Sequence, residues 1–314
     1  MTYVERKEEQ LKQQIIPQTM ESDFEEFWKN AVEALRAVPL HVERKLLDLP
    51  YKTFKAYEIT FNTHDETMVR GYFCVPNMRE GEKLPCVAVF HGGGGYRGIH
   101  PEIVATGVCT FSMDTRSQGG KTFDRAFYED VCDYNGSGIM AHGLADKENH
   151  YMKNIYLDAV RAIDVIESFP EVDASRIVAH GLSQGGALTI AAAALSGKVK
   201  KAYPCVHSYA CLERRVELGS GVFEAVKRYL NRYPAETDAV LRTLSYFDIN
   251  NLVSLLRVPT EFFLGLSDPI CLPPFVYSPY AHTKAEKKIT LSPLTGHDIS
   301  YDYKMELYRA FSLL

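Results

Sequence analysis

The pentapeptide Gly-Leu-Ser-Gln-Gly at residues 181–185 constrains the fold of this chain more than any other feature. The short segment 177–180 before it has the composition of a strand, and the alanine-rich segment 183–195 after it has that of a helix. A serine between two glycines at such a sharp turn is held above the carboxyl end of a sheet. The pattern therefore predicts a nucleophile at Ser183. The alternative is that Ser183 only caps the helix, because serine is a good N-cap residue.

The rest of the chain alternates between apolar segments of strand length and longer segments with helical periodicity. Strands are predicted at residues 53–62, 68–76, 84–90, 107–113, 177–180, 258–266 and 288–291. Helices are predicted at residues 22–36, 152–169, 183–195 and 303–314. This alternation predicts an α/β-hydrolase fold, with a mostly parallel, doubly wound sheet and helices on both of its faces.

The length of the chain and its interruptions predict the domain organisation. The 314 residues suit a single domain, so we expect one α/β-hydrolase domain over residues 1–314 with an N-terminal helical arm at about residues 1–38. Residues 203–251 break the alternation because they are helical, charged and aromatic. We expect this inserted region to form a cap or an interface. The long polar segment 115–150 is typical of a loop around an active site.

The partners of the predicted serine lie later in the chain, in the order that this fold requires. Asp268 follows the predicted strand 258–266, and His297 follows the predicted strand 288–291. We therefore predict that Ser183, Asp268 and His297 form a catalytic triad, in which His297 accepts the serine proton and Asp268 orients the imidazole. The alternatives are that Asp268 is a turn residue before proline and that His297 is a solvated loop residue.

The loop at residues 91–95, His-Gly-Gly-Gly-Gly, follows the predicted strand 84–90. Glycine allows a backbone amide to approach an acyl oxygen closely. We predict that the amides of Gly93 and Gln184 are the two donors of an oxyanion hole. The alternative is a merely flexible loop. A phosphate-binding loop is disfavoured, because the segment lacks the Gly-Lys-Ser/Thr ending and the spacing of a dinucleotide fingerprint.

Charge and hydropathy disfavour several classes of partner. The formal net charge of −5 is weakly acidic, so we expect no nucleic-acid partner. No run of about 18 apolar residues occurs, so we expect no membrane partner. Residues 1–14 are charged and lack the apolar core of a signal peptide, which favours a cytoplasmic protein.

The cysteines and histidines do not suggest a metal site. The seven cysteines are irregularly spaced and include no C-x-x-C pair, so we expect free buried thiols. His142 and His150 share a loop with Asp146 and Glu148, but no helix-borne pair of ligands supports them. We therefore expect neither metal nor cofactor, and a metal hydrolase is disfavoured.

Several longer motifs support a family resemblance. They are His-Gly-Leu at 142–144, Tyr-Leu-Asp-Ala-Val-Arg-Ala at 156–162, Ser-Gln-Gly-Gly at 183–186 and Thr-Leu-Ser-Tyr-Phe-Asp at 243–248. With these motifs the chain resembles, over nearly its whole length, the acetyl xylan esterase and cephalosporin C deacetylase family, carbohydrate esterase family seven. The family's hallmarks Arg-Gly-Gln, Gly-x-Ser-Gln-Gly and His-Glu correspond here to residues 116–118, 181–185 and 297–298.

The chain departs from the family's pattern at three positions. Ser117 replaces a glycine, Asp298 replaces a glutamate, and Gly93 stands where the family tends to carry a tyrosine whose amide is the oxyanion donor. The amide survives this last change, but we expect a wider pocket or a different substrate. We interpret Arg116 and Gln118 as supporting residues that hold the loop beneath the site. Alternatively, Arg116 binds a carboxylate of the substrate.

The resemblance also implies an activity and an assembly. We expect a serine carboxylic-ester hydrolase that removes short acyl groups, such as acetyl, from sugar-like or other small esters through an acyl-enzyme, with acetylated cephalosporins as further substrates. The family implies a homo-oligomer, a hexamer, with the strand pair at 53–76 and the region after Tyr203 as contact surfaces. The alternatives are a serine hydrolase or acyltransferase for another small ester or amide, and a non-catalytic relative that binds a ligand.

Overall fold

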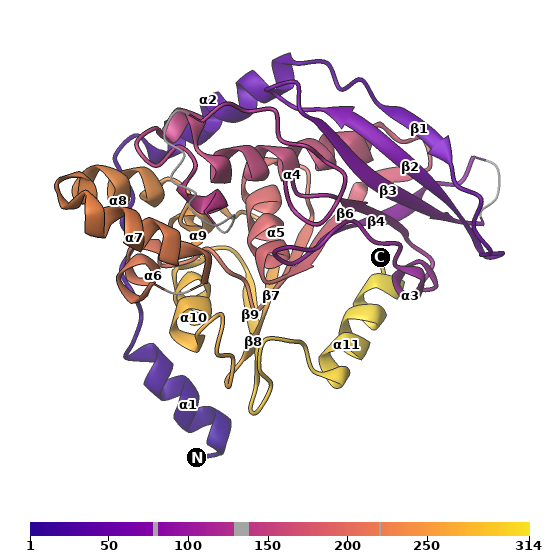
Figure 1. Cartoon of the computed structure of the whole chain (residues 1–314). Helices are drawn as coiled ribbons and strands as arrows, with labels where there is room; N and C mark the ends of the chain where they lie inside the picture. The colour runs from indigo at the N-terminus through magenta and orange to yellow at the C-terminus, as the bar shows by residue number, and fades with distance from the viewer. Residues whose placement is uncertain (78–80, 129–137, 220) are drawn as a thin grey trace.

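The computed structural model describes residues 1–77, 81–128, 138–219 and 221–314, and a nine-stranded sheet runs through them in the order β1-β2-β3-β5-β4-β6-β7-β8-β9 (Figure 1). The strands from β5 to β9 in this order pair in parallel, and β1, β2 and β3 extend the sheet as antiparallel strands. The strands are β1 (Glu43–Leu46), β2 (Phe54–Asn62), β3 (Met68–Pro76), β4 (Leu84–Phe90), β5 (Cys109–Met113), β6 (Val172–Leu182), β7 (Lys201–Cys205), β8 (Thr260–Gly265) and β9 (Lys287–Ser292).

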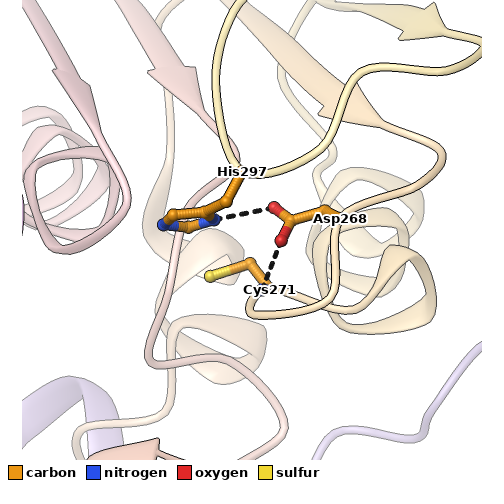
Figure 2. Close-up of side chains that lie close together, drawn as sticks. All are labelled: Asp268, Cys271 and His297. Atoms are coloured by element: carbon orange, nitrogen blue, oxygen red, sulfur yellow. Dashed lines mark hydrogen bonds and ion pairs between the residues drawn. The ribbon is translucent and has the colours of Figure 1, made fainter.

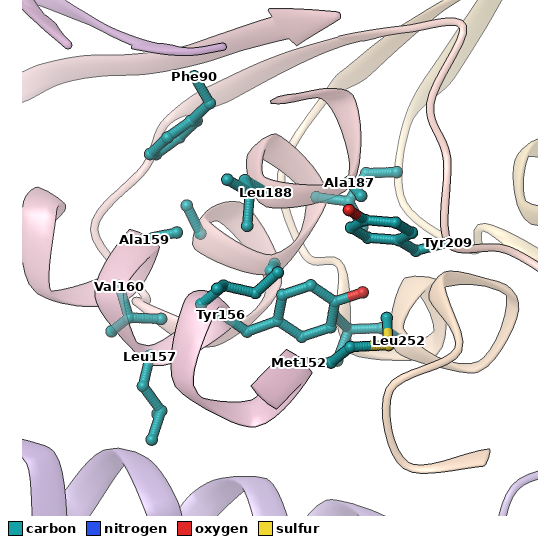
Figure 3. Close-up of a cluster of buried hydrophobic side chains, with 14 of the residues drawn as sticks. Phe90, Met152, Tyr156, Leu157, Ala159, Val160, Ala187, Leu188, Tyr209 and Leu252 are labelled. Carbon is teal, nitrogen blue, oxygen red and sulfur yellow. The ribbon is translucent and has the colours of Figure 1, made fainter. Parts of the chain in front are cut away.

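Helices cover both faces of the sheet. On one face lie α4 (Tyr151–Ser168) and α5 (Gln184–Leu195), with α2 (Phe24–Ala37) packed on them, and on the other lie α3 (Pro101–Val104) and α11 (Tyr301–Ser312). Strand β4 shows why both faces need helices. Its apolar side chains point alternately to the two faces: Ala88 packs with α4 and α5, whereas Val87 and Val89 pack with α3 and α11. Figure 3 shows part of the first core, in which Tyr156 and Ala159 of α4 lie near Leu188 of α5. The predicted doubly wound α/β-hydrolase fold is confirmed.

The remaining helices gather at the end of the molecule away from β1–β3 (Figure 1). They are α1 (Tyr3–Lys12), α6 (Leu212–Leu218), α7 (Glu224–Arg232), α8 (Thr237–Ser245), α9 (Ile249–Leu252) and α10 (Pro273–His282). The predicted boundary of the inserted region at 203 requires a correction, since residues 203–205 belong to strand β7 inside the sheet. Along the described ranges, no helix combines the length and the apolar character needed to cross a membrane.

The six cysteines within the described ranges are free and buried, as predicted. Cys132 lies outside the described residues. In the segment 115–150, His150 caps the N-terminus of α4, because its Nδ1 accepts a hydrogen bond from the Met152 amide at 3.0 Å. Burial lowers the pKa of His150 to about 3, so the imidazole is neutral and available for this role.

Candidate active site

Ser183 occupies the turn between β6 and α5 in a backbone conformation that non-glycine residues rarely adopt. Its φ is 59° and its ψ is −120°. The flanking glycines are required by close packing: a Cβ on Gly181 would lie 2.4 Å from the Gly185 carbonyl oxygen, and a Cβ on Gly185 would lie 1.9 Å from the Phe90 carbonyl oxygen. The two glycines therefore allow β4, β6 and α5 to meet directly beneath the serine.

The strained conformation of Ser183 is held by three backbone hydrogen bonds. Its amide donates to the Cys205 carbonyl at 3.0 Å, and its carbonyl accepts from the amides of Ala187 and Ser208, both at 3.1 Å. Backbone strain of this kind persists only where the surroundings over-determine it. The side chain is thereby fixed at the N-terminus of α5, where backbone amides favour negative charge.

Asp268 and His297 form a hydrogen-bonded pair in the loops that follow β8 and β9 (Figure 2). His297 Nδ1 lies 2.8 Å from Asp268 Oδ2, and Asp268 is 2% exposed. The other carboxylate oxygen, Oδ1, accepts from the amides of Ile270 at 2.8 Å and Cys271 at 2.9 Å. These bonds fix the carboxylate, which in turn orients the ring so that Nε2 is free to act as a base.

The carboxylate also changes the proton affinity of the ring. The hydrogen bond with Asp268, and after it the Cys271 thiol, raise the pKa of His297 above its ordinary value. The imidazolium that forms when His297 accepts a proton is therefore stabilised. Among the described residues no hydrogen bond joins Ser183 Oγ to His297.

Cys271 lies beside this pair and was not predicted as a site residue. A carboxylate oxygen of Asp268, the Cys271 sulfur and a ring nitrogen of His297 all lie within 4.8 Å of one another. A thiolate, an imidazole and a carboxylate at this spacing are ligands that Zn²⁺ accepts. Because the same Asp268 and His297 side chains would carry the catalysis, a metal ion bound there would compete with it. The spacing of three residues between Asp268 and Cys271 was the only signal in the sequence.

Ser183 lies in the wall of a pocket of about 270 Å³, together with both predicted oxyanion residues, Gly93 and Gln184. The pocket is also lined by Ser208, Tyr209, Arg215, Val222, Phe223 and residues 269–271. A Cβ on Gly93 would meet no atom within 4 Å, so the space beside this residue is open. Whether the pocket is wider than in relatives that carry tyrosine at this position stays a prediction.

Gln118 connects the glycine loop to the first residue of α5. Its Oε1 accepts from the Gly94 amide at 2.9 Å and from Gln184 Nε2 at 3.0 Å, and its Nε2 donates to Gln184 Oε1 at 2.7 Å. The Tyr209 hydroxyl donates to the same Gln184 Oε1 at 2.6 Å. Gln118 therefore lies between the two segments that carry the predicted oxyanion amides, where a supporting residue is needed.

Arg116 is fully buried beneath this loop and is surrounded by carboxylates. Its guanidinium makes two 2.7 Å hydrogen bonds to Asp158 and a 3.0 Å hydrogen bond to Asp124, and it also pairs with Asp65. Burial raises the pKa of Asp158 to about 6, and the Arg116 charge opposes this rise. Because its donors are used by these three carboxylates, the alternative that Arg116 binds a carboxylate of the substrate is not supported.

The two other departures from the family's motifs lie at the edge of the site. Ser117 has a φ of 52°, which explains why a glycine suits this position. Asp298 is exposed, and its Oδ1 accepts from the Ile299 amide at 2.7 Å instead of contacting the His297 ring.

A serine at a sharp strand-to-helix turn, with an acid and a histidine after two later strands of the parallel sheet, defines an α/β-hydrolase. The family can be stated more closely. The model of the acetyl xylan esterase family (AXE1) matches residues 1–312, and the chain belongs to this family. By family, it is a carboxylic ester hydrolase.

Individual relatives agree with this assignment. The solved acetyl xylan esterase from Paenibacillus sp. R4 is 33% identical, with a TM-score of 0.91 over 97% of this chain and 98% of that one. Acetyl xylan esterase 1 from Thermoanaerobacterium sp. JW/SL YS485 is 26% identical, with a TM-score of 0.89 over 97% of each chain. The acetyl esterase Axe7A of Xylanibacter ruminicola is 28% identical over 88% of this chain. The match spans only 63% of that longer protein.

Proposed function

We propose that this protein is a serine esterase that removes acetyl and other short acyl groups from acetylated sugars and similar small esters. The observation that carries the proposal is the placement of Ser183. It lies at a strained turn at the N-terminus of α5, in one pocket with Gly93 and Gln184, while Asp268 and His297 are hydrogen-bonded at the ends of neighbouring parallel strands. The names of the relatives, which include acetyl xylan esterases and an acetyl esterase, support the same class of substrate.

In the proposed acylation step, Ser183 Oγ attacks the ester carbonyl while His297 Nε2 takes the hydroxyl proton. The amides of Gly93 and Gln184 donate to the oxyanion of the tetrahedral intermediate. The bond between the carbonyl carbon and the alcohol oxygen then breaks, and His297 returns its proton to that oxygen. The products are a free alcohol and an acyl group on Ser183.

Deacylation repeats these steps with water. His297 removes a proton from a water molecule, which attacks the acyl carbon, and the intermediate collapses to release Ser183 and a carboxylic acid. Throughout the cycle Asp268 orients His297 and stabilises the imidazolium, since its two backbone donors hold the carboxylate against the ring.

The size of the pocket supports a short acyl group. A volume of about 270 Å³ is at the lower end for small-molecule sites and is bounded by Phe223 and Tyr209. We expect kcat/KM on 4-nitrophenyl esters to be highest for acetyl or propionyl and to fall sharply for longer chains. Equal rates on long acyl chains would contradict the proposed acyl specificity. Measuring the release of acetate from an acetylated sugar tests whether the alcohol portion of the substrate is a sugar.

The substrate range, assembly and location that the family suggests remain proposals of the same kind. Acetylated cephalosporins are proposed as further substrates, a hexamer as the assembly, and the cytoplasm as the location. Large apolar side chains are exposed at both predicted contact surfaces, and they support the assembly. They are Leu46, Tyr51 and Met68 near the strand pair at 53–76, and Leu218 and Tyr233 in the region after Tyr203. Light scattering of the purified protein tests the hexamer, and a monomer in dilute solution would contradict it.

A further inference from the structure

Arg215 on α6 is a buried arginine in the wall of the Ser183 pocket. Its side chain is 4% exposed. Within the described part of the chain it forms no ion pair, and its nearest hydrogen-bond acceptors are backbone carbonyls. Nε donates to the Ala210 carbonyl at 2.9 Å, and Nη1 lies at 3.5 Å from the Ile270 carbonyl. The charge of this guanidinium is thus neutralised by no carboxylate contact.

Two donors of this region have no hydrogen-bond partner among the described residues. They are Arg215 Nη2 and the hydroxyl of Ser208, both of which belong to residues that line the pocket. Buried polar groups are nearly always hydrogen-bonded, and an unpaired one needs an explanation such as a ligand. Ser208 is also fixed to the nucleophile, since its amide donates to the Ser183 carbonyl at 3.1 Å. The residue that carries one of the unpaired donors is therefore held directly against the catalytic turn.

Asp248 interacts with the charge of Arg215 through space, but its oxygens bond to backbone amides instead of to the guanidinium. Asp248 accepts from the amides of Cys211 at 2.8 Å, Leu212 at 2.7 Å and Asn250 at 2.8 Å. The ring of Phe275 lies 5.0 Å from the Arg215 guanidinium. His207, Tyr209 and Cys211 also interact with its charge. Burial lowers the pKa of His207 to about 3 and raises the pKa of Tyr209 and of Cys211, so none of the three carries a negative charge. Buried Arg116 and Arg97, in contrast, each contact at least two carboxylates.

We propose that Arg215 and Ser208 form a carboxylate-binding subsite in the wall of the catalytic pocket. A carboxylate there would supply the acceptor that Nη2 and the Ser208 hydroxyl lack and would neutralise the guanidinium, because arginine binds carboxylates with two parallel hydrogen bonds. The carboxylate comes either from the substrate, as on an acidic sugar ester, or from the acetate that deacylation releases. The inference rests on the proposed function for its biological use, but the binding event can be measured without turnover.

The substrate source is tested with a matched pair of esters, acetylated glucuronic acid and acetylated glucose, which differ in one carboxylate. The quantity is the ratio of kcat/KM for the acidic ester to kcat/KM for the neutral one, taken within each variant. We expect the ratio of the wild type to exceed that of Arg215→Met by about tenfold or more. Arg215→Lys, which keeps the charge but loses the planar donors, should give an intermediate ratio.

The product source is tested by binding acetate to the folded protein. Sodium acetate, compared with sodium chloride at equal ionic strength, should raise the unfolding temperature of the wild type and of Ser183→Ala, and should not raise that of Arg215→Met. Arg215→Met should itself be as stable as the wild type without acetate or more stable, since it removes an unpaired buried charge. A purely structural arginine would instead give a destabilised variant whose response to acetate and whose ester ratio are unchanged.

If Arg215→Met lowers the preference for the acidic ester, the subsite is supported and the carboxylate is that of the substrate. If Arg215→Met abolishes the rise in unfolding temperature with acetate, the subsite is supported and the carboxylate is that of the product. If neither changes, the subsite is overturned. A wild type that hydrolyses neither ester, but whose unfolding temperature rises with acetate only when Arg215 is present, would refute the proposed function and leave the subsite in place.

Discussion

At the scale of the residue, Ser183 combines the proposed chemistry with stored backbone strain. Its φ of 59° and ψ of −120° belong to a region that costs a non-glycine residue about 1–3 kcal/mol. Three backbone hydrogen bonds compensate for that cost: the Ser183 amide donates to the Cys205 carbonyl, and the Ser183 carbonyl accepts from the amides of Ala187 and Ser208. The fold thus tolerates a serine where glycine would be favoured, at the position where the proposed mechanism requires a hydroxyl.

Substitution of Ser183 separates the strain from the chemistry. Ser183→Ala keeps the Cβ and the strain, whereas Ser183→Gly relieves the strain, so we expect the glycine variant to be more stable by about 1 kcal/mol. Both variants should lose nearly all turnover. Denaturant unfolding measures the difference in stability, and an alanine variant more stable than the glycine variant would contradict the account.

The pH dependence of the reaction should report the contact between His297 and Asp268. A base must be neutral, so kcat/KM should fall as the pH falls through the pKa of His297. Because Asp268 and then Cys271 raise this pKa, the fall should be centred above the ordinary value of 6.5. Cys271→Ala should move the midpoint to lower pH. A wild-type midpoint at or below 6.5 would contradict the raised pKa.

At the scale of the element, the site depends on three loops that meet at the carboxyl edge of the sheet. The loop after β4 carries Gly93, the loop after β5 carries Gln118, and the turn after β6 carries Ser183. Gln118 joins them through the Gly94 amide and the Gln184 side chain. The loops are therefore positioned by one another as well as by the strands.

Removal of the Gln118 side chain should weaken this arrangement. We expect Gln118→Ala to lower kcat about 10–100-fold with a smaller change in KM, because the oxyanion donors lose their support. Tyr209→Phe is the matched control, since it removes only one hydrogen bond to Gln184 and should lower kcat less. Steady-state kinetics of both variants tests this, and an unchanged kcat in Gln118→Ala would contradict it.

The elements with a regular apolar pattern could be predicted from the sequence, and those without one could not. Strand β4 was predicted at residues 84–90, because its apolar run is buried on both faces. Strand β7 was missed, since Lys201 and Pro204 interrupt its pattern, and the predicted insertion therefore began too early. Strand β1 is short, charged and largely exposed, and α10 contains an internal proline, Pro279, so neither carries the usual signal.

The candidate triad was predictable for a different reason. Residues 183, 268 and 297 each follow a recognisable strand, and the order along the chain is a property of the fold. The pocket wall was not predictable, because Ser208, Arg215 and Phe223 come from the helical region after β7, whose path over the sheet is set by tertiary packing. Cys271 was missed because a buried cysteine is usually only a small apolar residue.

At the scale of the whole molecule, helix α2 of the N-terminal segment is part of the core. Trp28 of α2 is 1% exposed, its indole Nε1 donates to the Tyr246 carbonyl at 3.0 Å, and its ring lies 5.9 Å from that of Tyr156. Helix α2 thus joins the helical region after β7 to α4 on the sheet. This arrangement supports the proposal that residues 1–314 form one domain.

The single tryptophan makes this proposal measurable. If the chain is one cooperative unit, unfolding followed by Trp28 fluorescence and by far-ultraviolet circular dichroism should give coincident transitions. Two separated transitions would contradict a single domain. Trp28→Ala should reduce the free energy of unfolding by about 3–5 kcal/mol, and Trp28→Phe by less.

The central claim is that Ser183 is an activated nucleophile, and covalent labelling tests it most directly. The wild-type protein is treated with a fluorophosphonate and the modified peptide is identified by mass spectrometry. We predict a single stable adduct on Ser183, formed much more slowly in His297→Ala and absent in Ser183→Ala. A folded wild-type protein that is not labelled at Ser183, or one labelled equally fast without His297, would contradict the account.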